Sequence, residues 1–170
     1  MKYDLIIIGG GSAAFAAAAK VVELKKIVLM INSGLPLGGT CVNVGCMPSK
    51  NLLAQGDEFY YSQRPRFKSL RLKTRYQFDF KVAIKEKDRM VEKARKQNYT
   101  GVLKNLKGIT LLEERARLAG PNQVEAAHQL YEADKILIAV RASPKSIPVV
   151  VKEKRTVKQE SSPFSRNRSG

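Results

Sequence analysis

Residues 5–19 read LIIIGGGSAAFAAAA, an apolar run that ends in three glycines and continues as an alanine-rich segment. The apolar run predicts a buried strand, and the alanines favour a helix directly after it. A second apolar run, IVLMI at residues 27–31, follows that helix. A strand, a helix and a second strand in this order predict a parallel βαβ unit with a right-handed crossover.

The glycines carry the pattern G-x-G-x-x-A at Gly9, Gly11 and Ala14. Its place between a strand and a helix is what gives this pattern physical meaning. Gly9 permits a tight turn, Gly11 lets the backbone approach a pyrophosphate, and Ala14 lets the helix pack closely on the strand. The first helical turn, with Ser12 and Ala13, directs N–H groups toward the phosphates. A glycine-rich turn without any ligand is the alternative.

A dinucleotide site of this kind needs a residue for the ribose hydroxyls. An acidic residue is usual at the end of the second strand, and this chain has Asn32 there. An amide accepts and donates hydrogen bonds but lacks the charge-assisted strength of a carboxylate. We therefore expect dinucleotide binding with a weakened ribose contact.

The net charge of the chain suggests anionic partners. Lys and Arg outnumber Asp and Glu by 31 to 15, a net charge of +16, and nucleic acid is the first partner to consider. The aromatic-and-glycine pattern of known RNA-binding modules is missing, so we expect only nonspecific binding at low salt. No run approaches the roughly 20 apolar residues of a membrane span. The first residues lack a signal-peptide core, which makes the cytoplasm the expected location.

Residues 38–50, GGTCVNVGCMPSK, contain the two cysteines of the chain, Cys41 and Cys46. Structural zinc is not expected, because His128 is the only other soft donor. In a reducing compartment a cysteine pair is more often catalytic or metal-binding than a permanent cross-link. Five residue steps on a helix rise about 7.5 Å, whereas bridged Cα atoms lie within roughly 7 Å, so the helix must be distorted at Cys41. We expect Cys41 where a helix begins, with its pKa lowered by the helix N-terminus, and Gly45 as space for a flat ring.

The rest of the chain predicts one long helix and then a set of strands. Residues 78–105 have the apolar spacing of an amphipathic helix. Short alternating segments at residues 109–140 predict a small antiparallel layer that returns to a buried strand at residues 135–139. The basic connector up to about Tyr76 is expected to be exposed. Residues 151–170, dense in Ser, Lys and Arg, are expected to form a disordered tail.

The cysteine motif, together with IIIGGGSAAFAAA near the N-terminus, resembles the class I pyridine nucleotide-disulfide oxidoreductases, most closely mercuric reductase and dihydrolipoamide dehydrogenase. The motif is highly specific, and the resemblance runs from Met1 to about Pro148. It implies an α/β fold over residues 1–150. This is a Rossmann-like FAD-binding domain with a parallel sheet, crossover helices and a small antiparallel β lobe.

The resemblance also implies roles for individual residues. In this family NAD(P)H reduces FAD, and FAD reduces the cysteine pair. Cys41 would attack the substrate, a small-molecule disulfide or Hg(II), and Cys46 would contact the flavin. Lys50 would lie near flavin N5, and the backbone of Ala116 would contact the adenine. Further cofactor contacts are expected at Gly39, Thr40 and Ala139.

Some features depart from the family. Arg141 stands where the family commonly has a glycine, and it would either obstruct FAD or point to solvent. The resemblance implies that the NAD(P)H, central and dimerisation domains of the homodimeric family lie outside this sequence, as do its catalytic histidine and glutamate, which His128 does not match. The change in composition after Val150 suggests a frameshift or a truncation. A non-catalytic flavin-binding or interaction remnant is therefore the alternative function.

Overall fold

The computed structural model describes residues 2–67, 69–70 and 76–142. The predicted tail at residues 151–170 and the centre of the basic connector lie outside the described residues. The elements in chain order are β1 (Lys2–Ile8), α1 (Ser12–Glu23), β2 (Val28–Ile31), α2 (Gly39–Asn43), α3 (Cys46–Gln63), α4 (Phe80–Arg95), the π-helical turn η1 (Lys96–Thr100), α5 (Gly101–Asn105), β3 (Ile109–Leu112), β4 (Arg117–Gly120), β5 (Gln123–Ala126) and β6 (Gln129–Ile138).

The strands form one six-stranded sheet in the order β3-β2-β1-β6-β5-β4. Parallel pairing joins β3, β2, β1 and β6, whereas β6, β5 and β4 pair antiparallel. The predicted βαβ unit, the α/β fold class and the antiparallel lobe are confirmed. One assignment is wrong, because the segment that begins at Ile109 forms an edge of the parallel sheet beside β2 and not part of the antiparallel layer. The helices between β2 and β3 supply the long crossover that a parallel pair needs.

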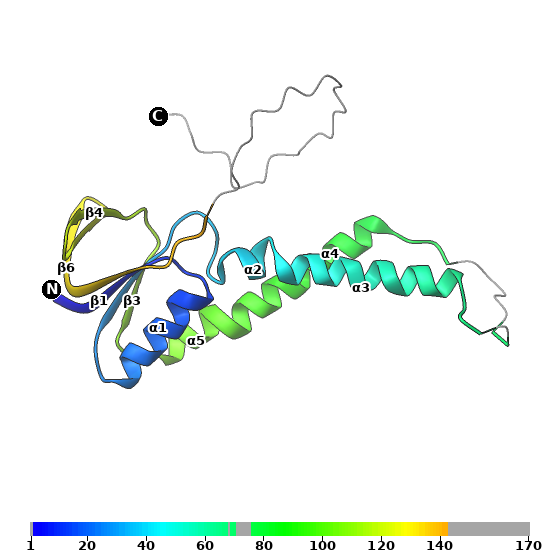
Figure 1. The fold of residues 1–170 in the computed structure, drawn as a ribbon, viewed down its shortest axis with the longest axis horizontal. Helices are drawn as coiled ribbons and strands as arrows, with labels where there is room; N and C mark the ends of the chain where they lie inside the picture. Colours follow the sequence, from blue (N-terminus) through cyan, green and yellow to red (C-terminus); the bar gives the residue numbers. More distant parts are fainter. Residues whose placement is uncertain (1, 68, 71–75, 143–170) are drawn as a thin grey trace, which may run out of the picture.

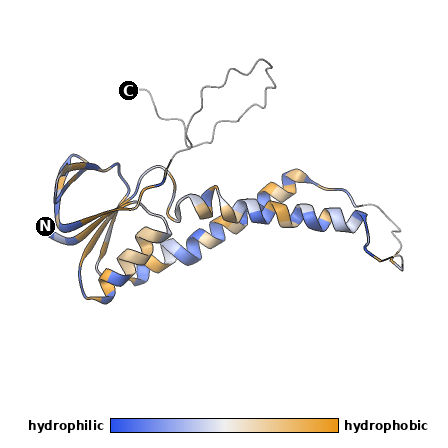
Figure 2. Ribbon diagram, viewed as in Figure 1, coloured by the Kyte–Doolittle hydropathy of each residue, from blue (hydrophilic) through white to orange (hydrophobic). Residues whose placement is uncertain are grey.

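Both faces of the sheet are buried at β1. Successive side chains of this strand point to opposite faces, and Ile6 and Ile7 are both fully buried. Ile7 packs with Ala14 and Ala18 of α1 on one face. Ile6 packs on the other face with Val124 and Ala133, which come from the antiparallel lobe. Figure 2 shows the resulting concentration of hydrophobic residues in the strands and α1. The small alanines let α1 lie close to the sheet, which fixes the position of its N-terminus.

The helices α3 and α4 lie side by side and extend away from the sheet (Figure 1). The predicted long helix is confirmed as the consecutive elements α4, η1 and α5. It is anchored on the domain by Tyr99, whose ring meets the edge of Phe15 at a centroid distance of 4.8 Å. Among the described residues, no helix combines the length and hydropathy that a bilayer crossing requires.

Candidate functional site

The glycine turn after β1 is held by backbone contacts on two sides. Gly9 has a φ of +129°, and a Cβ there would lie 2.2 Å from the carbonyl oxygen of Ala139. The Gly9 N–H donates to the carbonyl of Ile31 at 2.8 Å, which ties the turn to the end of β2. A side chain at Gly9 would therefore separate strand ends that must approach closely, as the prediction of a tight turn requires.

Gly11 and the first turn of α1 leave an open space at the helix N-terminus. Among the described residues outside this helix, a Cβ on Gly11 would have one neighbour within 4 Å, the Cα of Gly39 at 3.8 Å. Ser12 and Ala13 are exposed there, whereas Ala14 is fully buried beneath them. The first N–H groups of a helix have no acceptor within it, so this space suits an anionic group.

The other predicted cofactor residues gather at the same edge of the sheet. Asn32 follows β2, Ala116 lies between β3 and β4, and Ala139 follows β6. The carboxyl ends of the four parallel strands meet at this edge, which is where open α/β sheets bind ligands. The N–H of Asn32 donates to the carbonyl of Leu112 at 2.9 Å, and Ala116 packs against the core with Ile8. The structure thus brings these residues to the edge that bears the glycine turn.

The side chain of Asn32 is partly used by its own loop. Its Nδ2 donates to the carbonyl of Leu35 at 3.0 Å. Its Oδ1 packs over Gly10, where an added Cβ would lie 2.5 Å from that oxygen. The amide donor is therefore engaged, and the oxygen is the atom that remains for a ribose hydroxyl. The predicted ribose contact of Asn32 itself stays a prediction.

Gly38 and Gly39, which lead into α2, contact the glycine turn directly. The Gly38 N–H donates to the carbonyl of Gly10 at 2.8 Å. Gly39 has a φ of +63°, and a Cβ there would lie 2.9 Å from the Cα of Gly11. Thr40 is exposed beside this pair. The loop that leads to the cysteines and the predicted nucleotide turn therefore form one packed unit.

Cys41 and Cys46 lie on two different helices and are exposed free thiols. Cys41 belongs to the five-residue α2, and Cys46 is the first residue of the 18-residue α3. The predicted break in the helix is confirmed. Gly45 has a packing role at this break, because a Cβ there would lie 2.9 Å from the carbonyl oxygen of Thr40 and 3.4 Å from the Cα of Cys41. Its lack of a side chain lets α3 begin against the backbone of α2.

The predicted effect of a helix N-terminus on Cys41 is wrong. The longer helix begins at Cys46, and Cys41 lies within the short α2. The neighbouring Cys46 thiol raises the pKa of Cys41 above its usual value, and lost hydration raises it further, whereas the Lys50 cation acts in the opposite direction. Lys50 lies one helical turn after Cys46 and is exposed. The structure therefore brings Lys50 near the cysteine pair, and its predicted place beside flavin N5 stays a prediction.

Asn43 is a site residue that the sequence analysis missed. Its Nδ2 donates to the carbonyls of Gly39 at 2.8 Å, Pro36 at 2.9 Å and Leu37 at 3.3 Å. Asparagine side chains often bond to nearby backbone carbonyls, and an asparagine between the two cysteines was the available signal. The path of the loop determines which carbonyls it reaches.

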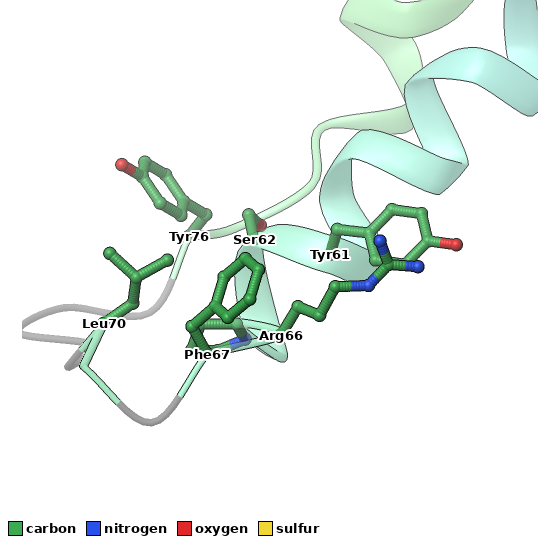
Figure 3. A pocket seen from close by; sticks show the side chains of 7 residues that line it. Tyr61, Ser62, Arg66, Phe67, Leu70 and Tyr76 are labelled. Carbon is green, nitrogen blue, oxygen red and sulfur yellow. The ribbon is translucent and has the colours of Figure 1, made fainter.

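A cavity of about 740 Å³ lies away from this site, at the far end of α3 (Figure 3). Tyr61, Phe67 and Tyr76 contribute aromatic rings to its lining. Cys46 begins the helix that ends near this cavity, and at 1.5 Å per residue its 18 residues separate the two places by about 25 Å. None of the predicted cofactor or cysteine residues lines this cavity.

Two further residues discussed from the sequence, His128 and Arg141, lie elsewhere in the fold. His128 is confirmed as a turn residue, because it occupies the two-residue hairpin between β5 and β6 with Ala127, at φ values of 58° and 49°. This hairpin precedes β6, whereas the glycine turn follows the parallel strand β1, so the two lie at opposite edges of the sheet. Arg141 is exposed, which favours the alternative in which it points to solvent.

The comparisons with known proteins agree with this geometry. A mercuric reductase from Lysinibacillus sphaericus is 37% identical over 149 residues, which cover 88% of this chain and 27% of the reductase. A dihydrolipoyl dehydrogenase from Mycoplasma genitalium is 30% identical over 147 residues, or 85% of this chain and 31% of that enzyme. The solved structure of the HOCl-induced flavoprotein disulfide reductase RclA from Escherichia coli shares the fold at a TM-score of 0.71 and 23% identity, covering 86% of this chain and 30% of that one.

The chain thus spans about a quarter to a third of the length of these relatives. A family model described as "Pyridine nucleotide-disulphide oxidoreductase" matches residues 3–166. The match extends beyond Pro148, near which the sequence predicted the resemblance to end. With the glycine turn and the cysteine motif in one packed unit, the chain belongs to the pyridine nucleotide-disulfide oxidoreductase family.

Proposed function

We propose that this chain binds FAD at the carboxyl edge of its parallel sheet and carries a redox-active disulfide formed by Cys41 and Cys46. The observation that supports this most is the packing of Gly39 on Gly11, where a Cβ on Gly39 would lie 2.9 Å from the Gly11 Cα. The turn that suits a diphosphate and the helix that carries Cys41 therefore belong to one site.

The residues at the glycine turn fit the diphosphate of FAD. Gly11 faces open space that an added side chain would enter, and the exposed Ser12 and Ala13 border it with the N-terminus of α1. Asn32 fits the ribose less well than a carboxylate would, because its amide nitrogen bonds to Leu35. We therefore propose that Asn32 contacts the ribose through Oδ1, and that the backbone near Ala116 contacts the adenine.

The proposed chemistry divides between cofactor and protein. FAD, when bound, supplies the two-electron chemistry that protein side chains lack. The protein holds the sulfur atoms: reduction of a Cys41–Cys46 disulfide by two electrons and two protons breaks the S–S bond and gives two thiols. Cys41 on α2 is the proposed attacking sulfur, and Cys46 is the proposed flavin-side sulfur. The pKa of Cys41 is raised, mainly by Cys46, and the Lys50 cation offsets part of that rise in favour of the thiolate needed for attack.

The chain spans only part of the length of its relatives. Proposals for its substrate, electron donor and assembly therefore rest on the similarity to those relatives. The names of those relatives suggest a dihydrolipoamide-type disulfide or Hg(II) as the substrate. We propose NAD(P)H as the electron donor and a homodimer as the assembly. We propose the cytoplasm as the location, because a reducing compartment favours catalytic cysteine pairs over permanent cross-links. No specific nucleic-acid or membrane partner is proposed.

The first test measures flavin binding by the Gly11→Val variant. The branched side chain would enter the open space beside the turn, so we expect at least a tenfold loss of affinity, about 1.4 kcal/mol. The measurement is a fluorescence titration of FAD with the purified chain. Gly56→Val is the matched control, because a Cβ on Gly56 meets nothing within 4 Å among the described residues. Equal affinity of Gly11→Val and the parent would reject the site.

A second measurement distinguishes a redox pair from the non-catalytic remnant that is the alternative. Thiol counts before and after mild reduction should differ by about two, since reduction of one disulfide yields two thiols. Mass spectrometry of the oxidised chain should show a linked Cys41–Cys46 peptide. A chain that binds FAD but never forms this link would be a flavin-binding remnant.

A further inference from the structure

Asn43 occupies an environment that accepts only a hydrogen-bond donor. The residue is half-buried at the end of α2, two positions after Cys41. Its Nδ2 is within 2.8 Å of the Gly39 carbonyl, 2.9 Å of the Pro36 carbonyl and 3.3 Å of the Leu37 carbonyl. All three partners are acceptors, and an amide nitrogen is the end of the asparagine side chain that can satisfy them.

These carbonyls belong to the segment that joins the two halves of the site. Gly38, in the middle of this segment, donates its N–H to Gly10 at 2.8 Å. Gly39, at its end, packs on Gly11. The Asn43 amide therefore binds a segment that also contacts the glycine turn, and so it helps to fix the position of α2 relative to that turn.

We infer that Asn43 is a positioning residue for the cysteine pair. Its bonds to Pro36 and Leu37 hold α2 in one orientation against the loop that precedes it, and this orientation determines where Cys41 stands relative to Cys46 at the start of α3. A fixed orientation keeps the two sulfurs at a high effective concentration and stabilises the disulfide relative to the dithiol. The inference rests on the proposed function, because it requires that Cys41 and Cys46 form a disulfide.

The test uses N43D, which keeps the shape of the side chain and exchanges its donor for an acceptor. At pH 7 the introduced carboxylate would face three carbonyl oxygens and repel them. We expect the equilibrium with glutathione to shift about tenfold toward the dithiol, which is about 30 mV for a two-electron couple. The equilibrium is measured by trapping and counting thiols across a series of glutathione ratios.

A pH series tests whether the introduced charge causes the shift. The introduced carboxylate, poorly solvated among carbonyls, will have a raised pKa. Once protonated it donates one hydrogen bond, so the difference between N43D and the parent should narrow as the pH falls. N98D is the matched control, because Asn98 is exposed and the same exchange there should leave the equilibrium unchanged.

N43L removes the donor without adding charge and covers the case in which N43D fails to fold. Circular dichroism reports folding in each variant. A folded variant with the parent's equilibrium constant would overturn the inference, and so would loss of the fold in both variants, which would make Asn43 a folding residue. A parent chain that forms no disulfide would instead reject the proposed function, and this role with it.

Discussion

At Cys41, opposing influences act on one exposed thiol. The neighbouring Cys46 thiol and lost hydration raise the pKa of Cys41, while the backbone N–H of Cys46 and the Lys50 cation lower it. The raising effects are larger, so the thiol of the reduced chain stays protonated to a higher pH than a free cysteine does. Cys41 therefore becomes a reactive thiolate near neutral pH only when the effect of the Cys46 thiol on its pKa is removed or offset.

The Cys46→Ala variant tests this balance. Removing the Cys46 thiol removes the main cause of the raised pKa of Cys41 and leaves Lys50 in place. We expect the curve of Cys41 alkylation by iodoacetamide against pH to move to lower pH. Lys50→Gln should move the same curve to higher pH, while Lys20→Gln, on α1 beside Glu23, should leave it unchanged. A curve that does not move in Cys46→Ala would contradict the cause assigned here.

At the scale of elements, the sequence pattern predicted those helices, strands and turns that depend on contacts between residues close together in the chain. The apolar runs predict the strands of the βαβ unit. Gly9 predicts its turn, because a side chain there would collide with the carbonyl oxygen of Ala139. The pairing of β3 with β2 could not be predicted in this way, because alternation is the same in parallel and antiparallel neighbours. The role of Asn43 was hidden for a related reason, since its acceptors at Pro36 and Leu37 come within reach only through the loop.

The Gly9→Ala variant tests how strongly the glycine turn is constrained. The new Cβ would lie 2.2 Å from the Ala139 carbonyl, at a φ of +129° that alanine rarely adopts. Backbone strain of roughly 1–3 kcal/mol and a clash of similar size predict a loss of about 2–6 kcal/mol. Gly34→Ala is the control, because φ is +85° there but no described atom lies within 4 Å. It should cost only about 1–2 kcal/mol.

Urea unfolding of both variants gives these free energies directly. The difference between Gly9→Ala and Gly34→Ala isolates the contact between the turn and the end of β6, because both positions have positive φ. Equal destabilisation would mean that the strand ends at Gly9 and Ala139 separate easily, and that the turn is not a rigid part of the site.

At the scale of the whole molecule, the described residues form a cofactor edge and a cysteine pair, joined by one loop. The chain matches about a quarter to a third of the length of each relative. His128, the single histidine of the chain, lies across the sheet from the glycine turn. No imidazole of this chain can therefore act as acid or base beside Cys41 and Cys46.

This arrangement predicts that the chain alone, even loaded with FAD, shows negligible NAD(P)H-dependent reduction of dihydrolipoamide-type disulfides or Hg(II). A bound flavin reacts specifically only when the protein positions its electron donor, and no histidine is available to move protons at the sulfurs. Dithionite should still reduce the bound flavin, and thiol counts would show whether the electrons reach Cys41 and Cys46. The measurement is steady-state NADH and NADPH oxidation at matched flavin concentration beside an intact relative. Turnover within about tenfold of that enzyme, a barrier difference of only about 1.4 kcal/mol, would mean that this chain is a self-sufficient reductase.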